Sequence, residues 1–282
     1  MLPRQVNAET ACKGNQVEGA GYNAHMCVAV FAWKVHPDYP LVFAGNRDEL
    51  HARPSSAAGF WKDAPQVLAG RDLTAGGTWL GVTGAGRFAV VTNYREGPVP
   101  KKGPRSRGEL TADFLRGVTS PRDYLEQVQR RAHGYAPFSL IVGDAEALWF
   151  FSNRDTRAPF EIPAGIHGLS NHLLDTPWPK VRLSEARLKT MLARGLPTTE
   201  DLEQLLADRM PAPADELPDT GIGAERERQI SPVFVVNPEY GTRCSTAILR
   251  ARNGGLHFTE RRFDATGKLF DHHDFHLAGE GA

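Results

Sequence analysis

Met26-Cys-Val-Ala-Val-Phe-Ala-Trp33 is a continuous apolar run that begins abruptly after a polar, glycine-rich segment. Its length and its content of Val and Phe are typical of a buried β-strand. A second run, Leu41 to Ala44, follows the turn residues His36-Pro-Asp-Tyr-Pro40, so we expect the two runs to pair as an antiparallel hairpin. The polar residues Asn46-Arg-Asp-Glu49 come directly after the second run, where a buried strand would be expected to end.

Composition divides the chain into three parts. Residues 1–25 are polar and show no periodicity, and we expect a disordered leader or a misassigned start, with a short propeptide as a third alternative. Residues 26–265 contain the apolar runs and are expected to form one domain, because 282 residues with 41% hydrophobic content can bury a full core without splitting. Residues 266–282 are expected to be a polar C-terminal tail.

Strand and helix signals occur in separate blocks along the chain. Further strands are expected at 78–83, 88–92, 138–143, 147–152, 233–236, 245–251 and 256–263. Helices are expected at 106–115, from Ser120-Pro121 onward, at 180–192 and at 199–209, and residues 210–228 indicate a surface loop. Because strands precede and follow the helices, the order indicates a layered α+β domain and not an alternating βαβ fold.

Charge and cysteine content exclude several classes of protein. Lys plus Arg and Asp plus Glu both number 33, so no general attraction to nucleic acid or to an anionic membrane is expected. Cys12, Cys27 and Cys244 are an odd number at irregular spacing, which argues against a disulfide framework and against a CxxC metal site. No stretch reaches the roughly 20 apolar residues of a membrane span. We therefore expect a cytoplasmic protein with a small-molecule substrate or ligand and with no cofactor or metal.

Cys27 stands directly behind Met26, and removal of an initiator methionine there would leave a free α-amine beside a thiol. An α-amine has a pKa of about 7.7 to 8.0, so it can accept a proton from a neighbouring nucleophile near neutral pH. Nucleophile and base would then belong to one residue. The alternative is that Cys27 is a small buried residue at the start of a core strand, which the apolar run alone favours.

The polar run from Asn46 to Glu49 alternates its side chains. In a regular strand Asn46 and Asp48 share one face and Arg47 and Glu49 share the other, so all four reach one site only with a turn or a bulge. Burying such groups is costly unless they are paired. An ordinary charged strand end in water is the alternative, and the local pattern favours neither.

Taken together, the motifs of the chain resemble the NRDE family, also called the transport and Golgi organisation protein 2 family. The resemblance rests on Met26-Cys27, the Asn46 to Glu49 run with Arg53-Pro54 behind it, Gly77-Thr-Trp-Leu-Gly81, Thr92-Asn-Tyr-Arg95, Gly168-Leu-Ser-Asn-His172, Asp175-Thr-Pro-Trp-Pro-Lys180 and Tyr240-Gly-Thr-Arg-Cys-Ser-Thr246. It spans Met26 to about Phe263. Each motif alone is weak, and their combination is specific.

The resemblance implies an N-terminal-nucleophile (Ntn) hydrolase fold, a four-layer αββα arrangement with two mainly antiparallel sheets between helical layers. It implies a catalytic role for Cys27 as nucleophile, Arg47 as stabiliser of the thiolate, Asp48 as partner of the α-amine, Asn93 and Asn171 as oxyanion donors, and Arg243 as the remaining member of the polar cluster. A side-chain amide suits the oxyanion role because it can donate a hydrogen bond to a developing negative oxygen.

The leading hypothesis is therefore a cysteine Ntn amidohydrolase that acts on a small non-peptide amide. A non-enzymatic carrier of haem or an acyl lipid on the same fold is the alternative, since members of the resembled family have been linked to haem mobilisation and lipid homeostasis. An inactive scaffold is a third possibility, because function belongs to sites and not to folds.

Other motifs have chemical potential but favour simpler interpretations. Asp271-His-His-Asp-Phe-His276 contains metal-capable side chains without a standard zinc spacing, and we expect a solvated tail. Lys101-Lys-Gly-Pro-Arg-Ser-Arg107 is a basic loop that could contact a phosphate or a carboxylate, although such loops are usually hydrated surface. Cys244, Trp79 and Trp178 are expected in the core.

Overall fold

The structure is a computed structural model that describes residues 27–97 and 103–279, and its strands form two antiparallel sheets. One sheet contains β1 (Cys27–Trp33), β2 (Leu41–Leu50), β10 (Gly165–Leu169), β11 (Tyr240–Arg250), β12 (Leu256–Phe263) and β13 (Leu269–Leu277). The other contains β3 (Ser55–Trp61), β4 (Ala64–Asp72), β5 (Leu80–Thr83), β6 (Phe88–Asn93), β7 (Phe138–Gly143), β8 (Leu148–Ser152) and β9 (Phe160–Glu161). The α-helices of the described residues are α1 (Gly108–Arg116), α2 (Pro121–Arg131), α3 (Pro179–Arg194), α4 (Thr199–Leu206) and α5 (Ala224–Gln229).

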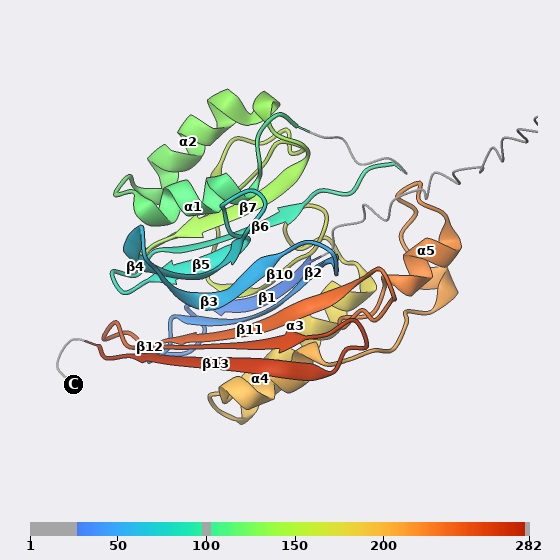
Figure 1. The fold of residues 1–282 in the computed structure, drawn as a ribbon. Helices are drawn as coiled ribbons and strands as arrows, with labels where there is room; N and C mark the ends of the chain where they lie inside the picture. The colour runs from blue at the N-terminus through green and yellow to red at the C-terminus, as the bar shows by residue number, and fades with distance from the viewer. Residues whose placement is uncertain (1–26, 98–102, 280–282) are drawn as a thin grey trace, which may run out of the picture.

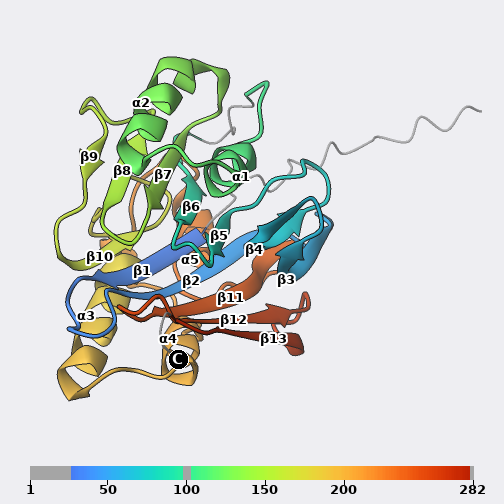
Figure 2. The same cartoon turned by 90° about the vertical axis from the view of Figure 1, so that its left-hand side faces the viewer.

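The two sheets face each other, and helices cover the outer face of each sheet (Figures 1 and 2). The strand order is β10-β1-β2-β11-β12-β13 in the first sheet and β3-β4-β5-β6-β7-β8-β9 in the second. Helices α1 and α2 pack on the second sheet through Phe114 and Leu125. Helices α3 and α4 pack on the first through Leu188 and Leu205. The expected α+β fold with four αββα layers is confirmed.

Strand β1 lies inside the molecule and is buried on both faces. Ala29, Phe31 and Trp33 pack between the two sheets, whereas Val28 and Val30 pack toward α3 and α4. None of these five side chains is more than 2% exposed. This double burial explains why the β1 sequence is continuously apolar and does not alternate with polar residues.

The local turn and cap signals agree with the structure. Strands β1 and β2 pair antiparallel, so the expected hairpin is confirmed, and β5 with β6 and β7 with β8 pair in the same way. Helix α2 begins at Pro121, and the side chain of Ser120 accepts a hydrogen bond from the backbone N–H of Asp123. Both features fix the first turn, because the proline needs no hydrogen bond there and the serine satisfies a free amide.

The structure corrects several expected segments. Residues 55–72, where the sequence signals no strand, form the β3–β4 hairpin, and residues 165–169 form β10. Strand β13 lies within the expected C-terminal tail and pairs with β12. Residues 233–236 do not form a strand, and Val236 makes only an isolated bridge to Gly241. This run is apolar because most of it is buried, not because it pairs in a sheet. The expected leader, 1–25, and Met26 lie outside the described residues.

Candidate functional site

Four residues form a row across the first sheet. Cys27 in β1 is opposite Arg47 in β2, Arg47 is opposite Cys244 in β11, and Cys244 is opposite Arg262 in β12. Residues directly opposite one another project from the same face of a sheet. Here that face is the one toward the second sheet, because Phe31, which has the same parity as Cys27 in β1, packs there.

The row borders a cavity of about 130 Å³, and both sheets contribute to its lining. Trp79, Val91 and Asn93 line it from the second sheet and its loops, and Arg107 and Gly108 line it at the start of α1. The charged part of the lining comprises six arginines and four carboxylates. The cavity thus joins a thiol to a strongly polar, partly enclosed space.

The thiol of Cys27 is buried, with the residue only 8% exposed. Burial raises the pKa of this thiol to about 12, and the negative charge of Asp48 acts in the same direction. A hydrogen bond from the backbone of Asp48 and the positive charge of Arg47 oppose the rise without cancelling it. At neutral pH the thiol therefore stays protonated, and it needs a nearby base to act as a nucleophile.

The backbone of Cys27 is held by the segment that follows β10. Its N–H donates to Oδ1 of Asn171 at 3.4 Å, and its carbonyl oxygen accepts from Oγ of Ser170 at 2.9 Å. Nδ2 of Asn171 donates to the carbonyl oxygen of Asn93 at 3.1 Å. Asn171 is fully buried and does not line the cavity, whereas Asn93 does. The two asparagines thus occupy different positions relative to Cys27.

The polar run of β2 keeps the alternation of a regular strand. Arg47 projects with Cys27 toward the second sheet and pairs with Glu49 through Nη2 at 3.2 Å. Nη1 of Arg47 is buried without a hydrogen-bond partner among the described residues. Asn46 lies on the opposite face, where its Nδ2 donates to the carbonyl oxygens of Leu206 and Val233. Strand β2 therefore needs no bend, because Arg47 lies on the face of Cys27 and Asn46 lies on the other face.

Asp48 lies on the helix-facing side with a buried lysine. Oγ1 of Thr242 donates to Oδ1 of Asp48 at 2.7 Å, while Oδ2 has no partner among the described residues. Burial raises the pKa of Asp48, and the positive charge of Lys180 opposes that rise. Lys180 is only 4% exposed, and burial lowers its pKa while the charge of Asp48 raises it. Each of these buried groups therefore shifts the pKa of the other, while Nζ of Lys180, like Oδ2 of Asp48, has no hydrogen-bond partner among the described residues.

Lys180 was not among the site residues predicted from the sequence. It appears only as the last residue of the Trp178-Pro-Lys180 motif, at the first turn of α3. A lysine at the start of a helix normally reaches water, but here α3 packs against β1 and β10, and Lys180 lies beside Glu227 and Ile230. The sequence predicted a helix at 180–192, but nothing in the neighbouring residues indicated that Lys180 would be buried.

Arg243 occupies a bulge in β11. The register between β11 and β2 shifts between Thr242 and Cys244, so Arg243 has no direct partner in β2. Its Nη1 donates to the carbonyl oxygens of Leu50, His51 and Arg53 at 2.9, 3.0 and 3.3 Å. The bulge is what brings this side chain to the cavity, together with its neighbour Cys244.

The second buried cysteine, Cys244, belongs to the same cavity. Burial raises its pKa well above the ordinary value. One strand lies between it and Cys27, so the two Cα atoms are separated by about two interstrand spacings, roughly 10 Å. A disulfide requires a Cα separation of about 4.4 to 6.8 Å. Both cysteines are free thiols.

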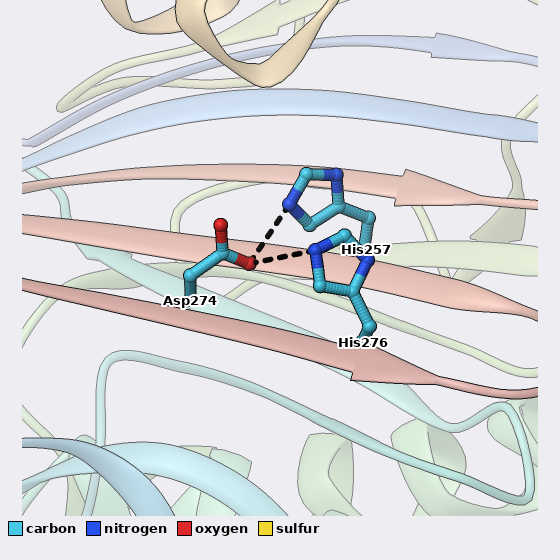
Figure 3. A group of neighbouring side chains, drawn as sticks. All are labelled: His257, Asp274 and His276. Atoms are coloured by element: carbon cyan, nitrogen blue, oxygen red, sulfur yellow. Dashed lines mark hydrogen bonds and ion pairs between the residues drawn. The ribbon is translucent and has the colours of Figure 1, made fainter.

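The histidine-rich segment of β13 forms a surface group with β12. His257 and His276 are direct cross-strand partners, and Nε2 of each contacts Oδ1 of Asp274, at 2.9 and 3.1 Å (Figure 3). The three ligand-type atoms lie within 4.8 Å of one another. None of these residues lines the Cys27 cavity. Contacts of both histidines with one carboxylate account for this geometry, and the group is separate from the candidate site.

The two facing antiparallel sheets and the helices on their outer faces define the class of fold. The structure has an Ntn-hydrolase fold, and it is similar to that of the Caenorhabditis elegans N-acylethanolamine-hydrolyzing acid amidase (NAAA) ortholog. The TM-score is 0.51 with 12% sequence identity, over 79% of this chain and 92% of that one. At this identity the similarity concerns the fold alone.

The chain belongs to the family described as Transport and Golgi organisation 2, which it matches over residues 26–265. The Transport and Golgi organization protein 2 homolog of Bos taurus is 37% identical over 276 residues, which cover 89% of this chain and 99% of that protein. The Homo sapiens homolog is 34% identical over 256 residues, covering 84% and 92%. The resemblance drawn from the motifs is thus confirmed. Within the described residues, no helix combines the length and apolarity that crossing a bilayer requires.

Proposed function

We propose that this chain is a cysteine Ntn amidohydrolase that cleaves a small non-peptide amide. The observation that carries the proposal is the position of Cys27 at the first residue of β1. Its thiol borders a polar cavity, and its backbone nitrogen lies against Asn171. A chain that begins at Cys27 would place a free α-amine at that nitrogen, next to the thiol that needs a base.

The reaction would use this amine as both base and acid. The amine takes the proton of Sγ as sulfur attacks the carbonyl carbon of the amide, and a tetrahedral oxyanion forms. The resulting ammonium returns the proton to the amide nitrogen, the C–N bond breaks, and an amine leaves. Water then attacks the thioester, the S–C bond breaks, and a carboxylic acid and the free thiol are released.

Each neighbouring residue would support one charge of this cycle. Arg47 favours the thiolate, since its positive charge lowers the pKa of Cys27. Asp48 offers an oxygen without a partner in the described chain, which suits a nearby ammonium. Asn171 would orient the amine through Oδ1, and Asn93 would face the oxyanion because it lines the cavity. Arg243 would close the polar end of the cavity.

The test is a comparison of chains with different N-termini. A protein whose first residue is Cys27 is assayed on short N-acylethanolamines, the substrate type named for the nematode amidase, and on other small amides. Turnover should be lost in Cys27→Ala and retained in Cys244→Ala, which removes the other buried thiol of the cavity. Equal turnover in Cys27→Ala and the parent protein would exclude the proposal.

The carrier alternative has less support from the cavity. Its volume of about 130 Å³ is below the roughly 300 to 1,000 Å³ typical of pockets that enclose drug-sized ligands. A haem or a long acyl chain would therefore need a different or enlarged space. Titration with haem and with palmitoyl-CoA, followed by thermal unfolding, tests this alternative, because a ligand of the folded state raises the melting temperature.

A further inference from the structure

The arginines of the Cys27 cavity differ in how their charge is balanced. Four of the six have carboxylate partners: Arg47 with Glu49 at 3.2 Å, Arg53 with Asp72 at 2.7 Å, Arg71 with Asp63 at 2.7 Å and Arg262 with Asp271 at 3.2 Å. Arg107 and Arg243 are the other two. These two have no carboxylate partner among the described residues, whereas Arg47 has one even though its Nη1 is unpaired.

Arg107 and Arg243 contact only backbone carbonyl groups within the described chain. Nη1 of Arg107 donates to the carbonyl oxygen of Pro137 at 3.1 Å. Nη1 of Arg243 donates to the three carbonyl oxygens that end β2 and begin the following loop. Nε and Nη2 of both side chains have no acceptor in the parts of the chain that the structure describes. Each guanidinium thus keeps one edge for another partner.

The pKa values of both side chains are lowered, as expected for a buried cation without a carboxylate partner. Burial lowers the pKa of Arg107 to about 10, and burial also lowers that of Arg243, with the positive charge of Arg47 adding to the effect. Glu49 and, when ionised, the Cys27 thiol raise the pKa of Arg107, which places its guanidinium within electrostatic range of the thiol. Both guanidiniums remain charged at neutral pH. An unpaired, partly buried cation is costly, and an anion that enters the cavity would remove that cost.

We infer that the cavity binds an anionic group of the substrate, a carboxylate or a phosphate, between Arg107 and Arg243. The inference rests on the proposed function and specifies it: the amide cleaved at Cys27 carries a negative charge close to the scissile bond. Guanidinium edges suit this class of ligand because they donate two parallel hydrogen bonds to carboxylate or phosphate oxygens. A cavity of about 130 Å³ accommodates such a small polar end.

Three small probes with the same acetyl amide test this inference. N-acetylethanolamine is neutral, N-acetylglycine replaces the hydroxymethyl group by a carboxylate, and O-phosphoryl-N-acetylethanolamine carries a phosphate. Binding is measured by calorimetry on the Cys27→Ala protein, so that no turnover interferes. We expect at least one anionic probe to bind ten times or more tightly than the neutral probe, and the better of the two identifies the anion. Equal affinities for all three, or no binding of any, would overturn the inference.

Two matched variants separate a specific contact from a general charge effect. Arg107→Gln should lower the affinity for the anionic probe by at least tenfold and leave the affinity for the neutral probe unchanged. Arg71→Gln removes the same charge from the same cavity. Because Arg71 is already paired with Asp63 through two hydrogen bonds, the affinity for the anionic probe should fall less than threefold in this variant. An equal loss of affinity in both variants would show that only the net charge of the cavity matters, and would contradict a specific contact with Arg107. Arg107→Lys should be intermediate, because it keeps the charge and loses the second donor.

Failure of this inference and failure of the proposed function give different results. If the anionic probe binds to Cys27→Ala but the protein that begins at Cys27 hydrolyses none of the probes, the anion site stands and the amidohydrolase proposal falls. If the neutral probe is hydrolysed at least as fast as both anionic probes and binds equally well, the amidohydrolase stands and the anion site falls.

Discussion

Exposing the α-amine of Cys27 should convert an inert thiol into a reactive one. With the preceding residues attached, burial holds the thiol pKa near 12, compared with an ordinary value of 9.0. At pH 8 this difference leaves about a thousandfold fewer thiolates than in a free cysteine. A more basic thiolate is also more nucleophilic, with a Brønsted slope of about 0.4 to 0.5, which restores roughly 20-fold. The net expectation is alkylation about 50 times slower than that of a free thiol.

Removal of the residues before Cys27 changes two quantities at once. The peptide nitrogen becomes an amine that can accept the thiol proton, and in its protonated form it adds a positive charge beside the sulfur. We expect the alkylation rate of Cys27 to rise at least tenfold, with a pH dependence centred near the ordinary amine pKa of about 8. The magnitude follows from bringing the base within one residue of the nucleophile.

Iodoacetamide labelling followed by peptide mass spectrometry measures this change residue by residue. One protein begins at Met1, and the other begins at Cys27 after proteolytic removal of everything before it. Cys244 is the internal control, because it is buried in the same cavity and its backbone nitrogen is unaltered. Labelling of Cys27 in the longer protein at the rate of N-acetylcysteine would refute the argument from burial. An unchanged rate after removal would refute the role of the amine.

Three further predictions concern stability. Lys180→Met removes the positive charge that opposes the raised pKa of the buried Asp48 carboxyl, so this pKa should rise further in the variant. Because a raised carboxyl pKa makes stability fall as pH increases toward that pKa, urea unfolding of the variant should show a steeper loss between pH 6 and 8.5 than the parent, and parallel curves would contradict this. Phe31→Ala empties a fully buried position between the sheets and should cost about 3 to 5 kcal/mol in the same assay, so a loss below about 1 kcal/mol would contradict the packing. Thr198→Ala removes the capping box with Asp201 and should lower the unfolding free energy by about 1 kcal/mol, whereas an unchanged midpoint would show that α4 does not need its cap.

Local patterns predicted the elements that hold the candidate site. The apolar run from Cys27 and the turn at 36–40 predicted the β1–β2 hairpin, because a strand buried on both faces is apolar throughout. The alternation of side chains along a strand also predicted that Arg47 and Asp48 lie on different faces, and in β2 Arg47 is opposite Cys27 whereas Asp48 lies near Lys180. Such features depend only on neighbours in the chain.

Other features of the molecule depend on contacts between distant segments. The tail interpretation failed for β13 because its side chains alternate between half-buried and exposed, so no local apolar signal marks it, and its pairing with β12 is what makes it a strand. Arg107 belongs to a basic loop that looks like hydrated surface, yet the start of α1 brings it to the Cys27 cavity. Neither the pairing of β13 nor the position of Arg107 could be predicted from neighbouring residues in the sequence.

The sequence by itself therefore determined the family, the hairpin that begins with Cys27 and the alternation of the polar run, since motif identity and strand periodicity are local properties. Only the tertiary structure decided which charges meet. The burial of Lys180 opposite Asp48 and the unbalanced pair of Arg107 and Arg243 arise because sheet register and helix packing join segments more than 100 residues apart. The free energy of a charge is set by the solvent and counter-charges around it, and those come from the fold.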